Sequence, residues 1–136
     1  MLYFVQYSIV SVSFALLILA WALMTWHHNN LSGFTASALD CIVFDAGDGL
    51  VVVDYSTTWC GPCKMVLPQY IELSEKYPEV KFLKCIGDSS ADASALMKRE
   101  GVRSVPSFHF WKGGVKIDSI NGARIDDVES IIKSSA

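Results

Sequence analysis

The chain has 136 residues, of which 51% are hydrophobic and 18% charged, and its formal net charge is −3 at pH 7. This length fits one domain, since domains typically run to about 100–150 residues. Binding to nucleic acid needs a basic face, and here the lysines and arginines are scattered, so nucleic acid is not expected as a partner. Four cysteines are too few and too unevenly spaced for a disulfide-stapled mini-protein.

Residues 1–26 contain no charged side chain, and a helix of about 20 apolar residues can cross a bilayer. Trp21 and Trp26 lie toward the end of the run, as in an interfacial aromatic belt. A secretory signal normally starts with positive charge, and no lysine or arginine precedes Lys64. Three interpretations stay open: a membrane anchor, a targeting peptide and a leader without function.

From this segment we expect a single-pass, membrane-anchored protein whose folded domain lies in a reducing compartment. The alternative is a cytoplasmic or plastid protein from which the segment has been removed. Residues 27–35 are rich in Asn, Ser, Gly and Thr and predict a linker. The domain should therefore cover residues 36–136. It should open with a short helix capped by Thr35 or Ser37, on which Cys41 is expected to be inert packing.

The apolar run 50–53 predicts a buried strand, and residues 64–77 have the spacing of an amphipathic helix. Between them lies Trp-Cys-Gly-Pro-Cys-Lys, residues 59–64, which places Cys60 where a helix begins. Free backbone N–H groups and the helix macrodipole stabilise a thiolate there, so Cys60 is the expected attacking thiol. Two cysteines separated by two residues can also form and break a disulfide. A zinc site is not expected, because it needs four ligands and no second CxxC or His pair is present.

Asp54 follows the run of valines and should be buried with that strand. Burial raises the pKa of a carboxylic acid, which suits the group to exchange a proton near neutral pH. The alternative is an aspartate that reaches a loop N–H or the solvent.

The rest of the chain predicts alternating elements: a strand over 80–86, a helix over 91–99, a hairpin with strands 108–111 and 115–120, and a helix over 126–133. This order predicts a mixed sheet covered by helices on both faces. Pro106 precedes the first hairpin strand, and an exposed edge there would let a substrate add by strand pairing. Cys85 and His109 are expected to be structural.

Five separated motifs together resemble the thioredoxin family over residues 36–136. They are Val53-Asp54, residues 59–64, Pro68, Val105-Pro106 and Gly122-Ala123. Residues 73–77 and the strand after them resemble plastid f-type thioredoxins. The resemblance implies the thioredoxin fold, an α/β fold, preceded here by a hydrophobic N-terminal helix, and a cis peptide bond between Val105 and Pro106.

The resemblance also implies the role of each site residue. Cys60 would be the nucleophile and Cys63 the resolving thiol, the two joined as a disulfide when oxidised. Asp54 would be the buried proton acceptor, with Lys84 as its charge partner. The substrate would contact Trp59, Gly61, Pro62, Ser104, Val105, Pro106, Gly122 and Ala123. Ser56 stands where many members carry an aromatic residue, so packing beneath the site should be looser.

The function implied is that of a protein-disulfide reductase, and neither a cofactor nor a metal is expected. Pro62 between the cysteines goes with a reducing potential of about −270 mV, which favours a reductase over an oxidase. Expected partners are disulfide-containing proteins, a thioredoxin reductase dependent on NADPH or ferredoxin, and a membrane through residues 1–26. We expect a monomer. Two alternatives stay open: a thiol oxidase or isomerase of a secretory compartment, and an adaptor that uses the fold without its redox chemistry.

Overall fold

The structure is a computed structural model that describes residues 35–136. The predicted apolar helix within residues 1–26 lies outside the described residues, as does nearly all of the predicted linker. Within the described part of the chain, none of the helices is both long and apolar enough to cross a bilayer.

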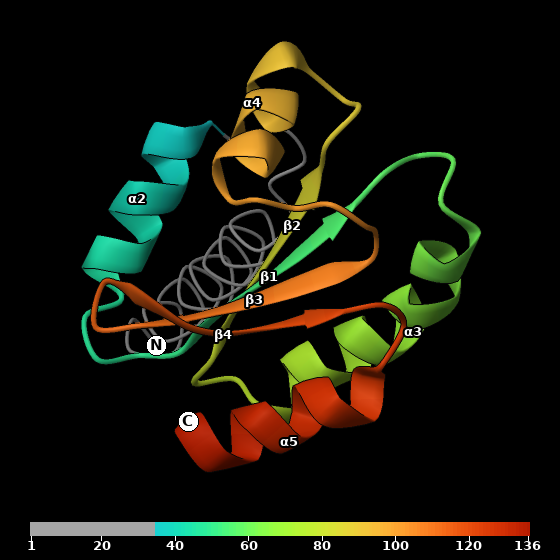
Figure 1. The fold of residues 1–136 in the computed structure, drawn as a ribbon. Coiled ribbons are helices and arrows are strands. Elements are labelled where there is room, and N and C mark those ends of the chain that lie inside the picture. The colour runs from blue at the N-terminus through green and yellow to red at the C-terminus, as the bar shows by residue number, and fades with distance from the viewer. Residues whose placement is uncertain (1–34) are drawn as a thin grey trace, which may run out of the picture. The chain divides into compact units, whose positions relative to one another are not determined.

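Four strands form one mixed sheet in the order β2-β1-β3-β4 (Figure 1). β1 pairs in parallel with β2 and antiparallel with β3, and β3 pairs antiparallel with β4. The elements along the chain are α2 (Ala36–Asp45), β1 (Val51–Ser56), α3 (Gly61–Lys76), β2 (Lys81–Ile86), α4 (Ala91–Arg99), β3 (Ser107–Lys112), β4 (Val115–Asn121) and α5 (Ile125–Ser135). The predicted mixed sheet with intervening helices is confirmed.

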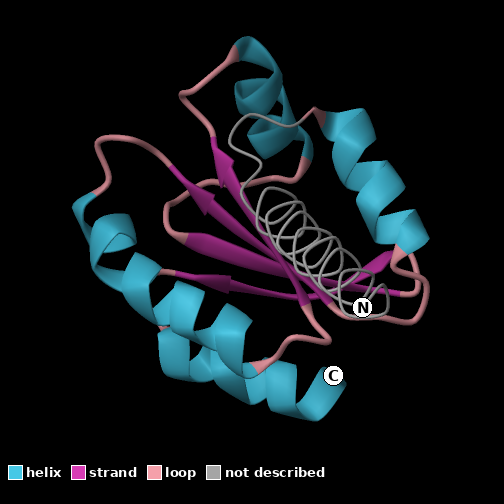
Figure 2. Cartoon of the chain, turned by 180° about the vertical axis from the view of Figure 1, so that it is seen from behind, coloured by secondary structure: helices cyan, strands magenta, loops and turns pink. Residues whose placement is uncertain are grey.

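Helices cover both faces of the sheet, with α3 and α5 on one side and α2 and α4 on the other (Figure 2). β1 is buried along its whole length, and its side chains alternate between the two cores. Val52 packs in the core under α3 and α5. Val51, Val53 and Tyr55 pack in the core under α2 and α4. The strand that leads to the cysteine pair is therefore the centre of the domain.

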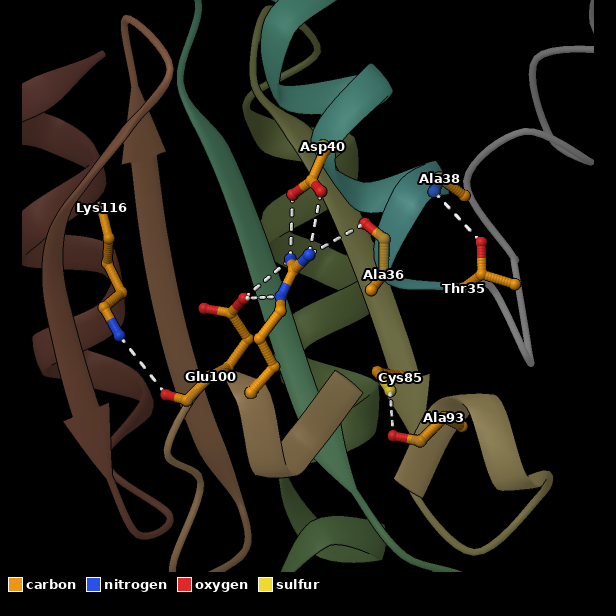
Figure 3. A network of polar contacts seen from close by, with 9 residues as sticks. Thr35, Ala36, Ala38, Asp40, Cys85, Ala93, Glu100 and Lys116 are labelled. Carbon is orange, nitrogen blue, oxygen red and sulfur yellow. Dashed lines mark hydrogen bonds and ion pairs between the residues drawn. The ribbon is translucent and has the colours of Figure 1, made fainter. Parts of the chain in front are cut away.

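An arginine joins the two helices of the second face. Arg99, at the end of α4, donates from both of its terminal nitrogens to the two carboxylate oxygens of Asp40 on α2, each at 2.9 Å (Figure 3). The same guanidinium pairs with Glu100 at 2.8 Å. Bidentate geometry of this kind is more specific than a single ion pair. It fixes α2 against α4 beside the sheet.

Three expectations need correction. α3 begins at Gly61 rather than near residue 64, because Cys60 is its N-cap and Pro62 suits the first turn. β3 lies between β1 and β4, so the strand that follows Pro106 is an interior strand and not an edge strand. Cys41 is exposed on α2 rather than packed.

Candidate active site

The cysteine pair lies at the carboxyl end of β1, where the chain turns into α3. Cys60 and Cys63 form a disulfide with an S–S distance of 2.01 Å and a Cα–Cα distance of 5.4 Å. Cys60 is the N-cap residue, and its sulfur accepts a hydrogen bond from the backbone N–H of Cys63 at 3.2 Å. A negative charge on this sulfur would face the positive end of a sixteen-residue helix.

Both sulfur-bearing residues are almost enclosed, since each is only 3% exposed. Pro62 is tolerated in the first turn because the N–H it lacks would have no partner inside the helix. Pro68 lies farther along α3, inside the helix. The sequence thus places a buried cysteine pair at the start of a helix.

Asp54 is fully buried in β1, two residues before the strand ends. Burial raises the pKa of its carboxyl group, and the nearby Lys84 charge lowers it by less. Its Oδ2 accepts a hydrogen bond from Lys84 Nζ at 2.7 Å, across the register pair of β1 and β2. The other oxygen of this buried acid, Oδ1, has no hydrogen-bond partner within residues 35–136.

A buried tyrosine fastens α3 to the sheet. The Tyr70 hydroxyl lies 3.0 Å from the carbonyl oxygen of Val52 in β1 and 2.9 Å from that of Leu83 in β2. The ring packs against Phe82 and Phe108. Tyr70 therefore fixes the helix that carries the cysteines against the two strands that carry Asp54 and Lys84. Its apolar periodicity alone marks it as a core residue and gives no sign of this hydrogen bonding.

Two loops lie at the start of β3 and the end of β4. The Val105–Pro106 peptide bond is cis, as expected. The carbonyl oxygen of Pro106 accepts a hydrogen bond from the backbone N–H of Gly122 at 2.8 Å. Gly122 has a φ of 91°, which residues with a side chain rarely adopt. Ser107 donates to the Asn121 side-chain oxygen at 3.0 Å, so a second hydrogen bond joins the first residue of β3 to the last residue of β4.

The expected contact residues differ in exposure. Trp59 is 73% exposed, and Gly61, Pro62, Ser104 and Ala123 are exposed as well. Val105 and Gly122 are half-buried, and Pro106 is buried. Ser56 is also buried, and its carbonyl oxygen accepts a hydrogen bond from the N–H of Gly87 at 2.9 Å. No loose packing is evident at this described position.

Two buried groups stand apart from the cysteine pair, as expected. Cys85 lies in β2 with its sulfur 4.0 Å from the carbonyl oxygen of Ala93 (Figure 3). Burial raises the pKa of its thiol to about 11. His109 lies in β3 against the ring of Tyr55, and burial lowers its pKa to about 4, so it stays neutral at pH 7. Both are structural.

Asp88 is a site feature that sequence patterns did not single out. It lies in the loop after β2 and accepts hydrogen bonds from the Thr58 backbone N–H at 2.9 and 3.1 Å and from the Thr58 hydroxyl. Thr58 immediately precedes Trp59 and Cys60. The two partners are thirty residues apart, so no local motif could have paired them.

Comparison with known proteins agrees with this geometry. The thioredoxin family model matches residues 33–134. Horse thioredoxin is 44% identical over 97 residues, which are 71% of this chain and 90% of that protein. Thioredoxin F2, chloroplastic, from Arabidopsis thaliana is 43% identical over 94 residues, 69% of this chain and 50% of that protein. The chain thus spans about half of this chloroplastic relative.

A solved structure of the complex of ferredoxin:thioredoxin reductase and thioredoxin f2 contains a similar fold. Its matching chain superposes with a TM-score of 0.69 at 37% identity and covers 77% of this chain and 93% of that one. The resemblance to f-type thioredoxins seen in the sequence is therefore supported over most of the domain.

The expectation of a membrane-anchored localisation is wrong. The relatives are thioredoxins, some of them chloroplastic, and the helices within residues 35–136 do not include one suited to crossing a membrane. The expected membrane contact rested on residues 1–26, which lie outside the described residues, and nothing in the described part supports it.

The cysteine pair at the start of α3 and the match to the family model and to these relatives lead to one conclusion. This chain belongs to the thioredoxin family and is a thiol-disulfide oxidoreductase that reduces protein disulfides.

Proposed function

We propose that the chain transfers two electrons to a protein disulfide through Cys60 and then Cys63. The observation that supports this most is the position of the Cys60 sulfur, at the N-terminus of α3 and hydrogen-bonded to the Cys63 N–H at 3.2 Å. In the reduced protein, a thiolate there is stabilised and can attack. Cys63 lies in the first turn of α3, three residues after Cys60, and would act second.

The exchange takes place in two steps. The Cys60 thiolate attacks one sulfur of the substrate disulfide, forms a mixed disulfide and releases the other sulfur as a thiolate, which takes up a proton. Cys63 then loses its proton and attacks Cys60, which forms the Cys60–Cys63 disulfide and releases the second substrate thiol. The substrate disulfide is reduced to two thiols, and the dithiol of this chain is oxidised.

Asp54 is proposed as the group that takes the proton of Cys63. It is buried in β1, the strand that leads to the cysteine pair, its pKa is raised by burial, and its Oδ1 has no partner within residues 35–136. Lys84 limits the rise, because its ammonium lies 2.7 Å from the other carboxylate oxygen. An acid with a raised pKa accepts a proton more readily, which suits it to serve as a general base near neutral pH.

The substrate would lie against a surface formed by exposed Trp59, the start of α3 and the two joined loops. We assign this surface to Trp59, Gly61, Pro62, Ser104, Val105, Pro106, Gly122 and Ala123. Glycines at 61 and 122 leave room for another chain, since an added Cβ at either would point into open space. The apolar indole provides contact area beside the sulfur.

A reductase would return the chain to its dithiol form. This reductase depends either on ferredoxin or on NADPH. An f2 thioredoxin was solved in a complex with ferredoxin:thioredoxin reductase, which supports the ferredoxin-dependent kind. Horse thioredoxin, which is not a chloroplastic relative, is as similar to this chain, so the NADPH-dependent kind is tested as well. Supplying each kind of reductase in turn, with the oxidised chain as substrate, decides between them.

The proposed function is tested by insulin reduction with dithiothreitol as the electron source. The wild-type chain should precipitate insulin chains, and Cys60→Ser should not. Cys63→Ser should instead accumulate mixed disulfides through Cys60, because the resolving thiol is missing. If Cys63→Ser captured no partner while Cys60 was free, the proposed order of attack would be wrong.

A further inference from the structure

The loop between β2 and α4 holds the segment that leads into the cysteine pair. The carboxylate of Asp88 in this loop accepts hydrogen bonds from the Thr58 backbone N–H at 2.9 and 3.1 Å and from the Thr58 hydroxyl. One residue earlier, the Gly87 N–H donates to the carbonyl oxygen of Ser56 at 2.9 Å. Residues 56 and 58 are thus both bonded to a loop thirty residues farther along the chain.

The loop itself is firmly placed. An added Cβ on Gly87 would come within 1.7 Å of the Met97 sulfur, so α4 packs directly on this glycine. The Ser89 hydroxyl donates to the Ile86 carbonyl oxygen at 2.6 Å. Ser90 caps α4 by accepting a hydrogen bond from the N–H of Ala93 at 3.1 Å. Asp88 therefore lies between positions fixed on both sides and can act as a rigid acceptor.

The positions of the Trp59 and Cys60 side chains depend on Thr58 to different degrees. Cys60 has its own supports: its sulfur accepts from the Cys63 N–H at 3.2 Å, and its carbonyl oxygen accepts from the Lys64 N–H at 3.4 Å as part of α3. Trp59 is 73% exposed, so packing does little to fix its indole. The placement of that indole rests on the backbone on either side of it, and Thr58 is one of those two sides.

From this difference we infer that Asp88 is a positioning residue for protein substrates: through Thr58 it sets where Trp59 meets the partner, and it leaves the reactivity of Cys60 unchanged. The inference rests on the proposed function, in which Trp59 contacts the substrate. A substrate that is large enough to touch the indole should depend on Asp88. A small disulfide that reaches only the sulfur should not.

The carboxylate of Asp88 is well suited to hold Thr58 in place. Its hydrogen bonds with Thr58 lower the pKa of Asp88 below its ordinary value, so it is ionised throughout the neutral range. Hydrogen bonds to a charged acceptor are about twice as strong as neutral ones. An asparagine could still accept from both Thr58 donors through its amide oxygen, whereas an alanine could accept from neither.

The test compares two substrates of the intact, reduced chain: insulin, and the small aromatic disulfide 5,5′-dithiobis(2-nitrobenzoic acid). Asp88→Ala should lower the second-order rate constant for insulin by about tenfold, since displaced contact groups cost one to two orders of magnitude. It should change the rate constant for the small disulfide by less than about twofold. Asp88→Asn should restore the insulin rate constant to within about threefold of wild type.

Matched variants separate the explanations. Asp92→Ala removes a nearby exposed carboxylate from the first turn of α4 without touching Thr58 and should leave both rate constants near wild type. Thr58→Ala removes the hydroxyl donor and should give a smaller effect than Asp88→Ala. Trp59→Ala tests the proposed contact on its own and should slow the reduction of insulin.

The inference is overturned if Asp88→Ala slows both substrates in parallel, if it slows neither, or if Asp92→Ala reproduces its effect. A wild-type chain that failed to reduce insulin would instead contradict the proposed function. A Trp59→Ala chain that reduced insulin normally would contradict the contact at Trp59 and overturn the inference with it. Circular dichroism melting of each variant verifies that the compared chains are folded.

Discussion

Cys60 and Cys85 are both almost completely buried, at 3% and 0% exposure, yet their surroundings differ in one decisive respect. Cys60 caps a helix and accepts a backbone N–H, so its environment favours a negative sulfur. Cys85 lies inside β2, where burial raises the pKa of the thiol to about 11. Because both residues are buried, exposure does not distinguish them, and the position of Cys60 at the junction of strand and helix does.

The largest expected effect is on exchange itself. Cys60→Ser should lower insulin reduction by about three orders of magnitude or more, because a hydroxyl cannot replace the thiolate. Cys85→Ala is the matched control, which should retain wild-type activity and cost about 1 kcal/mol of stability. Insulin turbidity and urea denaturation measure the two properties. A Cys85→Ala chain that lost activity while folded would abolish the contrast between the two cysteines.

The next effect concerns the proton. Asp54→Asn should slow resolution of the mixed disulfide by about a hundredfold at pH 7, the lower end of general base catalysis. The deficit should shrink as the pH rises and Cys63 ionises unaided. Stopped-flow release of a labelled substrate thiol between pH 6 and pH 10 measures it, and a deficit independent of pH would contradict the proposed proton transfer.

The same variant has a stability signature. Because the folded pKa of Asp54 is raised from 3.8, the folded state binds more protons than the unfolded state just above that pH. Stability is therefore lost as the pH rises through the raised pKa. Asp54→Asn should be more stable than wild type at pH 8, and the two should converge toward pH 4. Thermal melting across this range shows whether they do.

A smaller effect is expected at Lys84, which lowers the pKa of Asp54 through its charge. Lys84→Gln should raise the pKa of Asp54 further, and the pH profile of mixed-disulfide resolution should move toward alkaline pH. The rate at pH 7 should change by no more than about tenfold, since the carboxyl group itself remains. Lys81→Gln, an exposed change in the same strand, is the control. Equal profiles for the two variants would rule out a specific pairing.

The smallest effect belongs to Tyr70. Tyr70→Phe removes the hydroxyl that bonds to the carbonyl oxygens of Val52 and Leu83 and should cost about 1–3 kcal/mol of stability. Activity should change little, since α3 keeps its apolar packing. Urea denaturation measures the loss. An activity loss larger than that of Lys84→Gln would show that anchoring α3 matters more than tuning the acid.

The sequence predicts this fold well because its local signals agree. The valines of β1, the apolar spacing of α3 and the Gly113-Gly114 turn each specify one element and no other. The cysteine pair is equally easy to recognise in the sequence, since its members are three residues apart. The bounds of the helices are harder to predict than their presence. α3 begins at Gly61 because the Cys60 cap and Pro62 extend it toward the N-terminus.

Local sequence patterns could not predict which strands and side chains pair across the fold. β3 lies inside the sheet because β4 returns beside it, so the strand after Pro106 is not an edge strand. The bonds of Asp88 to Thr58 and of Tyr70 to two strands join residues thirteen to thirty positions apart. The pair of Asp54 and Lys84 was expected through family resemblance, since its members are thirty residues apart as well.

The most direct test is the pH dependence of alkylation of the reduced chain by iodoacetamide, followed at Cys60 and at Cys85 by peptide mass spectrometry. We expect half-maximal alkylation of Cys60 clearly below about pH 8.5, the ordinary midpoint of a cysteine thiol, while Cys85 remains unmodified across that range. Alkylation of Cys60 that begins only above this midpoint, or of Cys85 alongside it, would contradict the claim that the helix start makes the reactive sulfur.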